Sequence, residues 1–279
     1  MSGTIAQVLR EASQKLISQT DVPQLEAEIL LAHVLSQPRS YLFSRSSEVL
    51  LPETENSFWS LVNRRQQGEP VAYLTGHREF WSLDLEITKE VLIPRPETEL
   101  LVELVLEKMG SRAQVKLADL GTGSGAIALA IAHERPQWEI YAADQSQAAL
   151  NVALRNAKRL NIQNVIFSQS DWLAAFPAIQ LDVIVSNPPY LADDDVHLQL
   201  GDLRFEPSSA LISGKEGLDA IRKIVASSRR YLKCGGYLFL EHGYQQGAAV
   251  RGLFETAEYT DIETFRDLAA LERVTFGKV

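Results

Sequence analysis

The chain has 279 residues, of which 46% are hydrophobic and 23% charged, a composition typical of a folded globular protein with room for two domains. Its formal net charge of −9 argues against a general nucleic-acid-binding protein, which usually carries a basic surface. One cysteine, Cys234, excludes an intrachain disulfide, and the five histidines show no ligand spacing, so no metal site is predicted. The sequence shows neither a signal peptide nor an apolar run of spanning length, so we expect a cytoplasmic protein without membrane contact.

The N-terminal part of the chain predicts a small helical bundle over residues 1–73. Apolar residues recur at helical spacing over residues 5–17, and Thr4 can cap the start of that helix. Three further helical segments are expected between Asp21 and Gly68. This region has no excess of basic residues, so it does not resemble a nucleic-acid-binding module.

The next segment, residues 74–93, changes in character. Apolar residues between Phe80 and Ile87 alternate partly with polar ones, which predicts a β-hairpin that links two domains. Prolines on both sides of Arg95 then interrupt the chain, and a helix is expected over residues 98–109.

From Val115 onward, predicted strands and helices alternate. Strands are expected at residues 115–120, 139–143, 165–167, 181–185, 237–240, 262–265 and 273–276. Helices are expected at residues 124–134, 147–160, 218–232 and 246–254. This alternation predicts an α/β fold, with a mostly parallel sheet covered by helices on both faces.

A glycine-rich turn follows the first of these strands. It contains Gly121, Gly123 and Gly125, and glycine lets the backbone turn tightly and lets a ligand approach closely. Asp144, at the end of the next predicted strand, can accept hydrogen bonds from both hydroxyls of a ribose. The pattern predicts a nucleoside site, although a dinucleotide fingerprint that uses Ala126 also fits the spacing.

Acidic and aromatic residues around this turn favour S-adenosylmethionine over NAD. Asp119 can attract the cationic amino group or sulfonium of a methyl donor and would be badly placed beside a pyrophosphate. Asp171 offers a carboxylate to an adenine amino group, and Trp172 offers an indole that can cover the ring. Both follow the third strand of the predicted sheet, at the edge where ligands bind.

The tetrapeptide Asn187-Pro188-Pro189-Tyr190 directly follows another predicted strand. The Asn187 side-chain oxygen accepts hydrogen bonds without carrying charge, and the two prolines hold the nearby carbonyls stiffly. Tyr190 supplies a flat face for stacking. These groups suit a planar –NH2 group held by its hydrogens with its nitrogen left open, although the tetrapeptide alone also fits a polyproline recognition segment.

Together the motifs resemble the HemK/PrmC-type release-factor glutamine N5-methyltransferases, and the resemblance spans nearly the whole chain. The segments that carry it are Gly76–Trp81, Leu92–Glu99, Asp119–Gly125, Val185–Tyr190, Glu206-Pro207, Leu240–Gly243 and Arg266–Ala269. The Asn-Pro-Pro-Tyr element is shared with adenine-N6 methyltransferases, whereas the proline-rich segment and the helical N-terminal region are more specific. Ala270 stands where the family pattern has glycine, so we assign that tail no catalytic role.

The resemblance implies a helical substrate-binding domain at residues 1–73, a β-hairpin linker at 74–93, and a seven-stranded Rossmann-like methyltransferase domain at 94–279 whose last hairpin is antiparallel. The implied cofactor is S-adenosyl-L-methionine, converted to S-adenosyl-L-homocysteine. The predicted cofactor contacts are Asp119, Gly121, Thr122, Gly123, Ser124, Gly125, Asp144, Asp171, Trp172 and Asn187.

The resemblance also implies a substrate: the glutamine in the Gly-Gly-Gln motif of class-1 peptide chain release factors. Residues Asn187, Pro188, Pro189 and Tyr190 are predicted to hold this glutamine, and Arg95 and Glu97 are predicted to line the same cleft. An exposed ion pair is the alternative interpretation of Arg95 and Glu97. We expect a monomer that does not bind nucleic acid stably.

Three alternative functions share part of this sequence pattern. An adenine-N6 DNA or RNA methyltransferase would also hold a planar –NH2 group, on a base flipped out of its stack. The acidic net charge and the absence of a basic target-recognition region disfavour that function. A nicotinamide-dependent dehydrogenase, the second alternative, leaves residues 187–190 unexplained, and a non-catalytic binding module does not need them.

Overall fold

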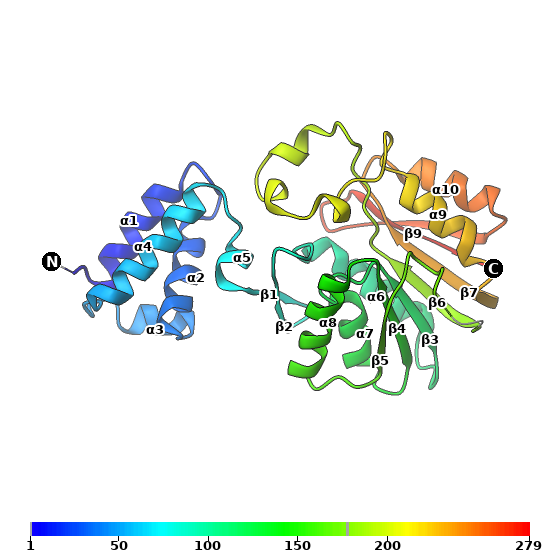
Figure 1. The fold of residues 1–279 in the computed structure, drawn as a ribbon, viewed down its shortest axis with the longest axis horizontal. Coiled ribbons are helices and arrows are strands. Elements are labelled where there is room, and N and C mark those ends of the chain that lie inside the picture. Colours follow the sequence, from blue (N-terminus) through cyan, green and yellow to red (C-terminus); the bar gives the residue numbers. More distant parts are fainter. Residues whose placement is uncertain (1, 177–178) are drawn as a thin grey trace. The chain divides into compact units, whose positions relative to one another are not determined.

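The computed structural model describes residues 2–176 and 179–279, which form two compact units. The first, here called the helical unit, groups the N-terminal residues through His77 with a second segment, Val196–Phe205. The second, the sheet unit, consists of Arg78–Asp195 and Glu206–Val279. The predicted α/β class, with a helical region before the sheet, is confirmed (Figure 1). The sequence pattern does not anticipate the second segment of the helical unit.

The helical unit is a bundle of short helices around one apolar core. Its helices are α1 (Ile5–Leu16), α2 (Pro23–Leu35), α3 (Arg39–Ser44), α4 (Pro52–Gln66) and α5 (Val71–Thr75), with the 3-10 turns η2 (Val196–Gln199) and η3 (Leu203–Phe205). Thr4 caps α1 as predicted, because its side chain accepts from the Gln7 backbone N–H and the Gln7 side chain bonds back to Thr4. Fully buried residues such as Leu30, Phe58 and Val62 form the core.

Arg65 ties the two segments of the helical unit together. Its guanidinium donates to Glu26, with Nε 2.7 Å from Oε2, and to Asp202, with Nη1 3.0 Å from Oδ1. The side chains of Arg65 and Glu26 are only 7% and 13% exposed, so this ion pair lies largely out of water, whereas the Asp202 side chain is 39% exposed. Arg204 adds a hydrogen bond to the carbonyl of Gln67 at 2.7 Å.

The predicted hairpin is present and consists of β1 (His77–Phe80) and β2 (Leu83–Glu86). Trp81 and Ser82 form its turn with φ angles of 52° and 59°, the left-handed geometry that a two-residue hairpin turn requires. Buried Asn156 anchors the hairpin through both backbone polar groups of Glu86, at 2.7 Å and 3.0 Å. The same amide donates to the carbonyl of Ser124 at 3.0 Å, so it also holds the glycine-rich turn.

The sheet has seven strands in the order β5-β4-β3-β6-β7-β9-β8. They are β3 (Lys116–Leu120), β4 (Glu139–Asp144), β5 (Val165–Gln169), β6 (Leu181–Ser186), β7 (Leu232–Glu241), β8 (Thr260–Arg266) and β9 (Glu272–Lys278). The first five are parallel, and β9 is antiparallel to both β7 and β8, as predicted. The strand order reverses between β3 and β6, and ligands bind beyond the carboxyl ends of the strands at such a reversal.

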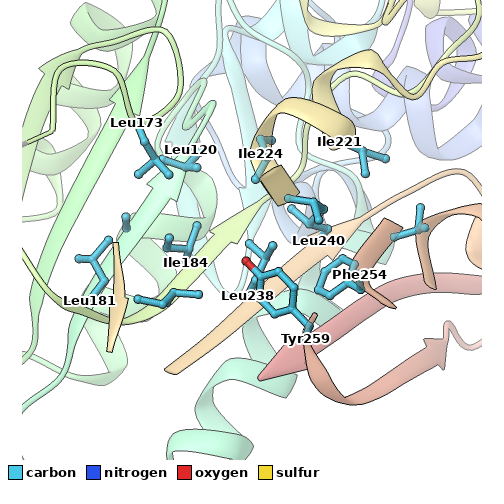
Figure 2. Packing of buried hydrophobic residues seen from close by; sticks show 14 of the residues in the cluster. Leu120, Leu173, Leu181, Ile184, Ile221, Ile224, Leu238, Leu240, Phe254 and Tyr259 are labelled. Atoms are coloured by element: carbon cyan, nitrogen blue, oxygen red, sulfur yellow. The ribbon is translucent and has the colours of Figure 1, made fainter. Parts of the chain in front are cut away.

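The helices of the sheet unit are η1 (Pro96–Thr98), α6 (Glu99–Met109), α7 (Ala126–Glu134), α8 (Gln147–Arg159), η4 (Ser208–Ala210), α9 (Asp219–Ser228) and α10 (Gly247–Thr256). On one face of the sheet, Ile221 of α9 and Phe254 of α10 pack against strand residues that include Leu120, Ile184 and Leu238 (Figure 2). Each such side chain contributes about 1.5–3 kcal/mol when fully buried. This core holds the ends of β3, β6 and β7 in place.

The predicted boundaries around β7 are wrong. We expected a helix through Leu232 and a strand from Tyr237, but α9 ends at Ser228 and β7 already begins at Leu232. The sequence Gly235-Gly236 suggested a break before the strand. Instead the strand continues through an irregular register between its pairs Leu181–Leu232 and Val183–Tyr237, and Gly235 adopts a positive φ of 76° there. Across residues 2–176 and 179–279, no helix combines the length and the apolar character needed to cross a bilayer.

Candidate active site

A cavity lies beyond the carboxyl ends of the parallel strands of the sheet unit. Seven of the predicted site residues line it: Gly121, Gly123, Asp144, Asp171, Trp172, Asn187 and Pro189. They come from the end of β4 and from the loops after β3, β5 and β6, so the reversal in strand order brings four separate segments to one place. The other lining residues were not predicted as site residues, and they are Glu90, Val91, Leu92, Gln145, Ser146, Ala149, Ser170, Pro207, Ser209 and Ala210.

The glycines of the turn serve different purposes. All three have positive φ, 73° at Gly121, 56° at Gly123 and 85° at Gly125. A Cβ at Gly123 would meet no atom within 4 Å, so this position faces open space. A Cβ at Gly125 would lie 3.0 Å from Leu129 Cδ1, so that glycine is needed for packing at the start of α7. The helix was predicted to begin at Ser124, but Gly125 is still part of the turn and α7 begins at Ala126.

Asp144 is held rigidly at the cavity wall. Its Oδ2 accepts from the Gly123 backbone N–H at 2.9 Å, and its Oδ1 accepts from Ser146 N–H at 2.8 Å. Each carboxylate oxygen keeps a further lone pair for a ligand. Burial raises the pKa of Asp144, and the backbone hydrogen bonds from Ser146 and Gly123 oppose that shift. The carboxylate therefore forms a preorganised acceptor for a diol.

Asp119 lies behind the turn and not on the cavity wall. It is fully buried, and its Oδ2 accepts from Thr122 Oγ1 at 2.7 Å and from Ala128 N–H at 3.2 Å. Its Oδ1 has no hydrogen-bond partner in the described part of the chain. Burial raises the pKa of this carboxyl to about 7. Thr122 and Ser124 are also buried, so the predicted cofactor segment divides into residues that line the cavity and residues that support them.

Trp172 and Asp171 line the cavity next to the glycine turn. A Cβ placed on Gly121 would lie 3.4 Å from Cζ3 of Trp172, so the indole packs closely over this glycine. Trp172 has a φ of 52°, an unusual value for a large side chain. Strain of this kind concentrates at functional sites, where the surrounding structure enforces it.

The Asn187–Tyr190 segment continues from the carboxyl end of β6. Asn187 and Pro189 face the cavity, whereas Pro188 is buried. The Asn187 Nδ2 donates to Thr98 Oγ1 at 3.2 Å, and the carbonyl of Tyr190 accepts from Gln246 Nε2 at 3.0 Å. Burial, with the nearby charge of Glu241, raises the pKa of Tyr190. Two of the four residues therefore form part of the cavity wall, and hydrogen bonds hold the segment at both ends, which argues against a free polyproline segment.

Within the described part of the chain, Arg95 pairs with a buried acid and forms no ion pair with its neighbour Glu97. The guanidinium forms an ion pair with Glu206, whose side chain is fully buried and also accepts from the Ile93 backbone N–H at 3.0 Å. This pair fixes the proline-rich segment to the segment that contains Pro207. The sequence marked Glu206 only as part of the family resemblance, because nothing local shows that it faces Arg95.

The PrmC N-terminal domain family matches residues 7–76, and the methyltransferase small domain family matches residues 97–211. The chain is 49% identical to a release factor glutamine methyltransferase of Xylella fastidiosa (strain 9a5c), over 92% of this chain and 94% of that protein. It is 47% identical to the enzyme of that name from Escherichia coli (strain K12), over 97% of both.

A solved methyltransferase from Pyrococcus furiosus shares the fold, with a TM-score of 0.54 at 17% identity, over 77% of this chain and 96% of that one. The sequence matches go further than the fold, because they cover the helical unit as well as the sheet. They confirm the family that the motifs indicated. The chain belongs to the release factor glutamine methyltransferases.

Proposed function

We propose that this protein transfers a methyl group from S-adenosylmethionine to the side-chain amide nitrogen, N5, of the glutamine in the Gly-Gly-Gln motif of class-1 peptide chain release factors. One observation carries the proposal. In a chain of this family, Asn187 and Pro189 line the same cavity as the glycine turn and Asp144. An acceptor for an –NH2 group therefore lies beside a site with the chemistry of a nucleoside pocket.

The donor set of the cavity fits S-adenosylmethionine. We assign the ribose hydroxyls to Asp144, the adenine ring and its amino group to Trp172 and Asp171, and the close backbone approach to Gly121 and Gly123. The open space at Gly123 supports this assignment. The Oδ1 of Asp119 has no hydrogen-bond partner among the described residues, and from behind the turn the ionised carboxylate would attract a cationic ligand in the cavity. When bound, the cofactor supplies an electrophilic methyl group.

The residues of the tetrapeptide prepare the substrate amide. An amide nitrogen is a poor nucleophile because its lone pair is delocalised into the carbonyl. The Asn187 Oδ1 and the Pro188 carbonyl accept hydrogen bonds from its two N–H groups. These hydrogen bonds raise the electron density on the nitrogen and favour its pyramidal form. Tyr190 stacks on the amide plane and holds it in line with the methyl group. Positioning and fixed dipoles supply most of the rate. The nitrogen becomes strongly acidic once it is methylated, so its proton leaves late, to water or a carbonyl, and no strong general base is required.

The proposed role of the helical unit is recognition of the release factor. The match to the PrmC N-terminal domain supports a role specific to this family. Arg95, held by Glu206, and Glu97 are assigned to the substrate cleft. We place the reaction in the cytoplasm, where translation terminates, and expect the protein to act as a monomer.

The test is mass spectrometry of a purified class-1 release factor after incubation with the enzyme and S-adenosylmethionine. We expect a mass gain of one methylene unit, located on the glutamine of the Gly-Gly-Gln motif. The Asn187→Ala enzyme serves as the matched control and should leave the release factor nearly unmodified. Methylated adenine in DNA or RNA, with an unmodified release factor, would establish the alternative function.

A further inference from the structure

Thr98, Asn187 and Glu241 come from three distant segments and meet beside the cavity. Thr98 is the last residue of η1, Asn187 follows β6, and Glu241 ends β7. The Thr98 side chain is buried, and its oxygen accepts from Asn187 Nδ2 at 3.2 Å. The same hydroxyl lies close enough to the carboxyl of Glu241, which is also buried, to lower the pKa of that acid as a hydrogen-bond donor. The three side chains therefore form a chain of hydrogen bonds that ends in an acid.

The direction of these hydrogen bonds is set by the acid. An ionised carboxylate only accepts hydrogen bonds, so Thr98 must direct its single hydroxyl proton toward Glu241. The Thr98 oxygen then has only lone pairs left for Asn187, which must present its –NH2 group. Because the side-chain amide is planar, Oδ1 lies on the opposite side from Nδ2 and is left available to another donor.

We propose that Glu241, acting through Thr98, fixes the side-chain amide of Asn187 in the orientation that leaves Oδ1 for the substrate –NH2. Thr98 and Glu241 are then positioning residues, and this role rests on the proposed function of Asn187. The opposite orientation would place an –NH2 group against the –NH2 group of the substrate, and two donors cannot bond to each other. A free asparagine could adopt either orientation, so the acid makes one of them obligatory.

The charge state of Glu241 controls this arrangement. The charged and titratable groups that face it are Arg273 of β9, Glu97 of η1, Arg95 just before η1, and Tyr190. Arg273 is itself held by Asp267, with Nε 2.8 Å from Oδ2. Burial raises the pKa of Glu241 to about 7, against the opposing effects of Thr98 and Arg273. Its Oε2 has no hydrogen-bond partner in the described residues.

The sign of the pH effect follows. An acid with a raised pKa holds its proton below that pH, so Glu241 is neutral in acid and ionised above about 7. A neutral carboxyl can donate to Thr98, and the Thr98 hydroxyl is then free to donate to Asn187 Oδ1. That hydrogen bond would hold Asn187 in the unproductive orientation. Turnover should therefore fall as pH decreases through 7.

The kinetic test uses Thr98→Val, which keeps the shape and removes the hydroxyl, with Thr98→Ser as the rescue. We expect Thr98→Val to lower kcat about 10- to 100-fold, with KM for the release factor and Kd for the methyl donor nearly unchanged, and Thr98→Ser to restore most of the loss. Glu241→Gln should remove the acidic limb of the kcat profile near pH 7. Thr256→Val and Glu263→Gln are the matched controls, because they alter exposed residues far along the chain. They should leave kcat and the acidic limb of its pH profile unchanged.

Two kinetic outcomes would overturn the proposal. One is a Thr98→Val variant in which cofactor affinity falls and KM rises by factors as large as the fall in kcat. Such a result would indicate a structural role. The other is an acidic limb that persists in Glu241→Gln, which would assign the limb to another acid such as Asp119.

An activity-independent readout separates this proposal from the proposed function. In 15N NMR spectra, the Asn187 side-chain –NH2 signal is identified by its absence in Asn187→Ala. At pH 8 its protons should exchange slowly in the wild type and in Thr98→Ser, and should exchange in Thr98→Val about as fast as those of exposed Asn151. Unchanged exchange in Thr98→Val refutes the positioning role even if release factors are methylated. Protected Asn187 protons in a protein that does not methylate release factors would support the positioning role and refute the proposed substrate.

Discussion

Acids in the interior of the helical unit are paired with arginines, whereas two of the buried acids of the sheet unit are left incompletely paired. Glu26 pairs with Arg65, and Glu28 pairs with Arg39. In the sheet unit, Asp119 Oδ1 and Glu241 Oε2 have no hydrogen-bond partner in the described part of the chain, and burial raises the pKa of both carboxyls to about 7. Compensated charges hold a structure together, whereas incompletely compensated ones concentrate at functional sites.

The largest effect on stability should come from breaking a compensated charge in the helical unit. Arg65→Met leaves Glu26 and Asp202 without their cation, and removal of one partner from a buried pair costs about 3–5 kcal/mol. Hydrogen exchange should locate the loss in α1, α2 and α4, without weaker binding of S-adenosylhomocysteine. Arg222→Met is the matched control, because this more exposed arginine also contacts two carboxylates and should contribute about 0–1 kcal/mol.

The largest effect on catalysis should come from Asn187→Ala. Loss of an acceptor that acts in the transition state should lower kcat by about 10²- to 10³-fold, with only a small loss of methyl-donor affinity. Steady-state kinetics with a purified release factor measures the first quantity, and calorimetric titration the second. Asn151→Ala, an exposed residue of α8, should behave as the wild type. Undiminished turnover in Asn187→Ala would rule out the proposed amide clamp.

A smaller effect is expected at Asp144, where the acceptor is held by the backbone. Asp144→Ala removes a charged acceptor for the ribose hydroxyls and should raise the Kd for the methyl donor about 10- to 100-fold. Asp144→Asn keeps the shape and one acceptor, so its Kd should lie between those of the wild type and Asp144→Ala. Calorimetric titration with S-adenosylhomocysteine measures both. Equal affinity in all three proteins would contradict the ribose assignment.

The smallest effect should appear in the pH dependence of stability. Asp119 and Glu241 have folded-state pKa values raised to about 7, so between about pH 4 and pH 7 the folded protein binds more protons than the unfolded chain. Stability of the unliganded sheet unit should therefore fall as pH rises through this window. Calorimetry should show a Tm lower at pH 8 than at pH 6 by a few degrees, and Glu241→Gln should flatten the slope. A Tm that rises over this range would show that other groups dominate.

Much of the architecture could be predicted because its signals are local. The capping pair Thr4 and Gln7, the glycine turn, and the alternation of strands and helices each depend on residues close together in sequence. The predicted start of β7 is wrong because it also relied on a local signal. Gly235 suggests a break in the strand, and only the pairing with β6 shows that the strand continues through an irregular register.

The sequence by itself determined the family, the α/β class and the residue types of the site. Only the tertiary structure decided which of these residues line the cavity and which support it, as with Gly123 and Asp119. It also decided that Arg95 meets Glu206, and that Thr98 joins Asn187 to Glu241. These partners are far apart along the chain, and burial depends on every segment packed around a residue. Local sequence therefore specifies the chemical groups, while packing sets their partners, their charge and their orientation.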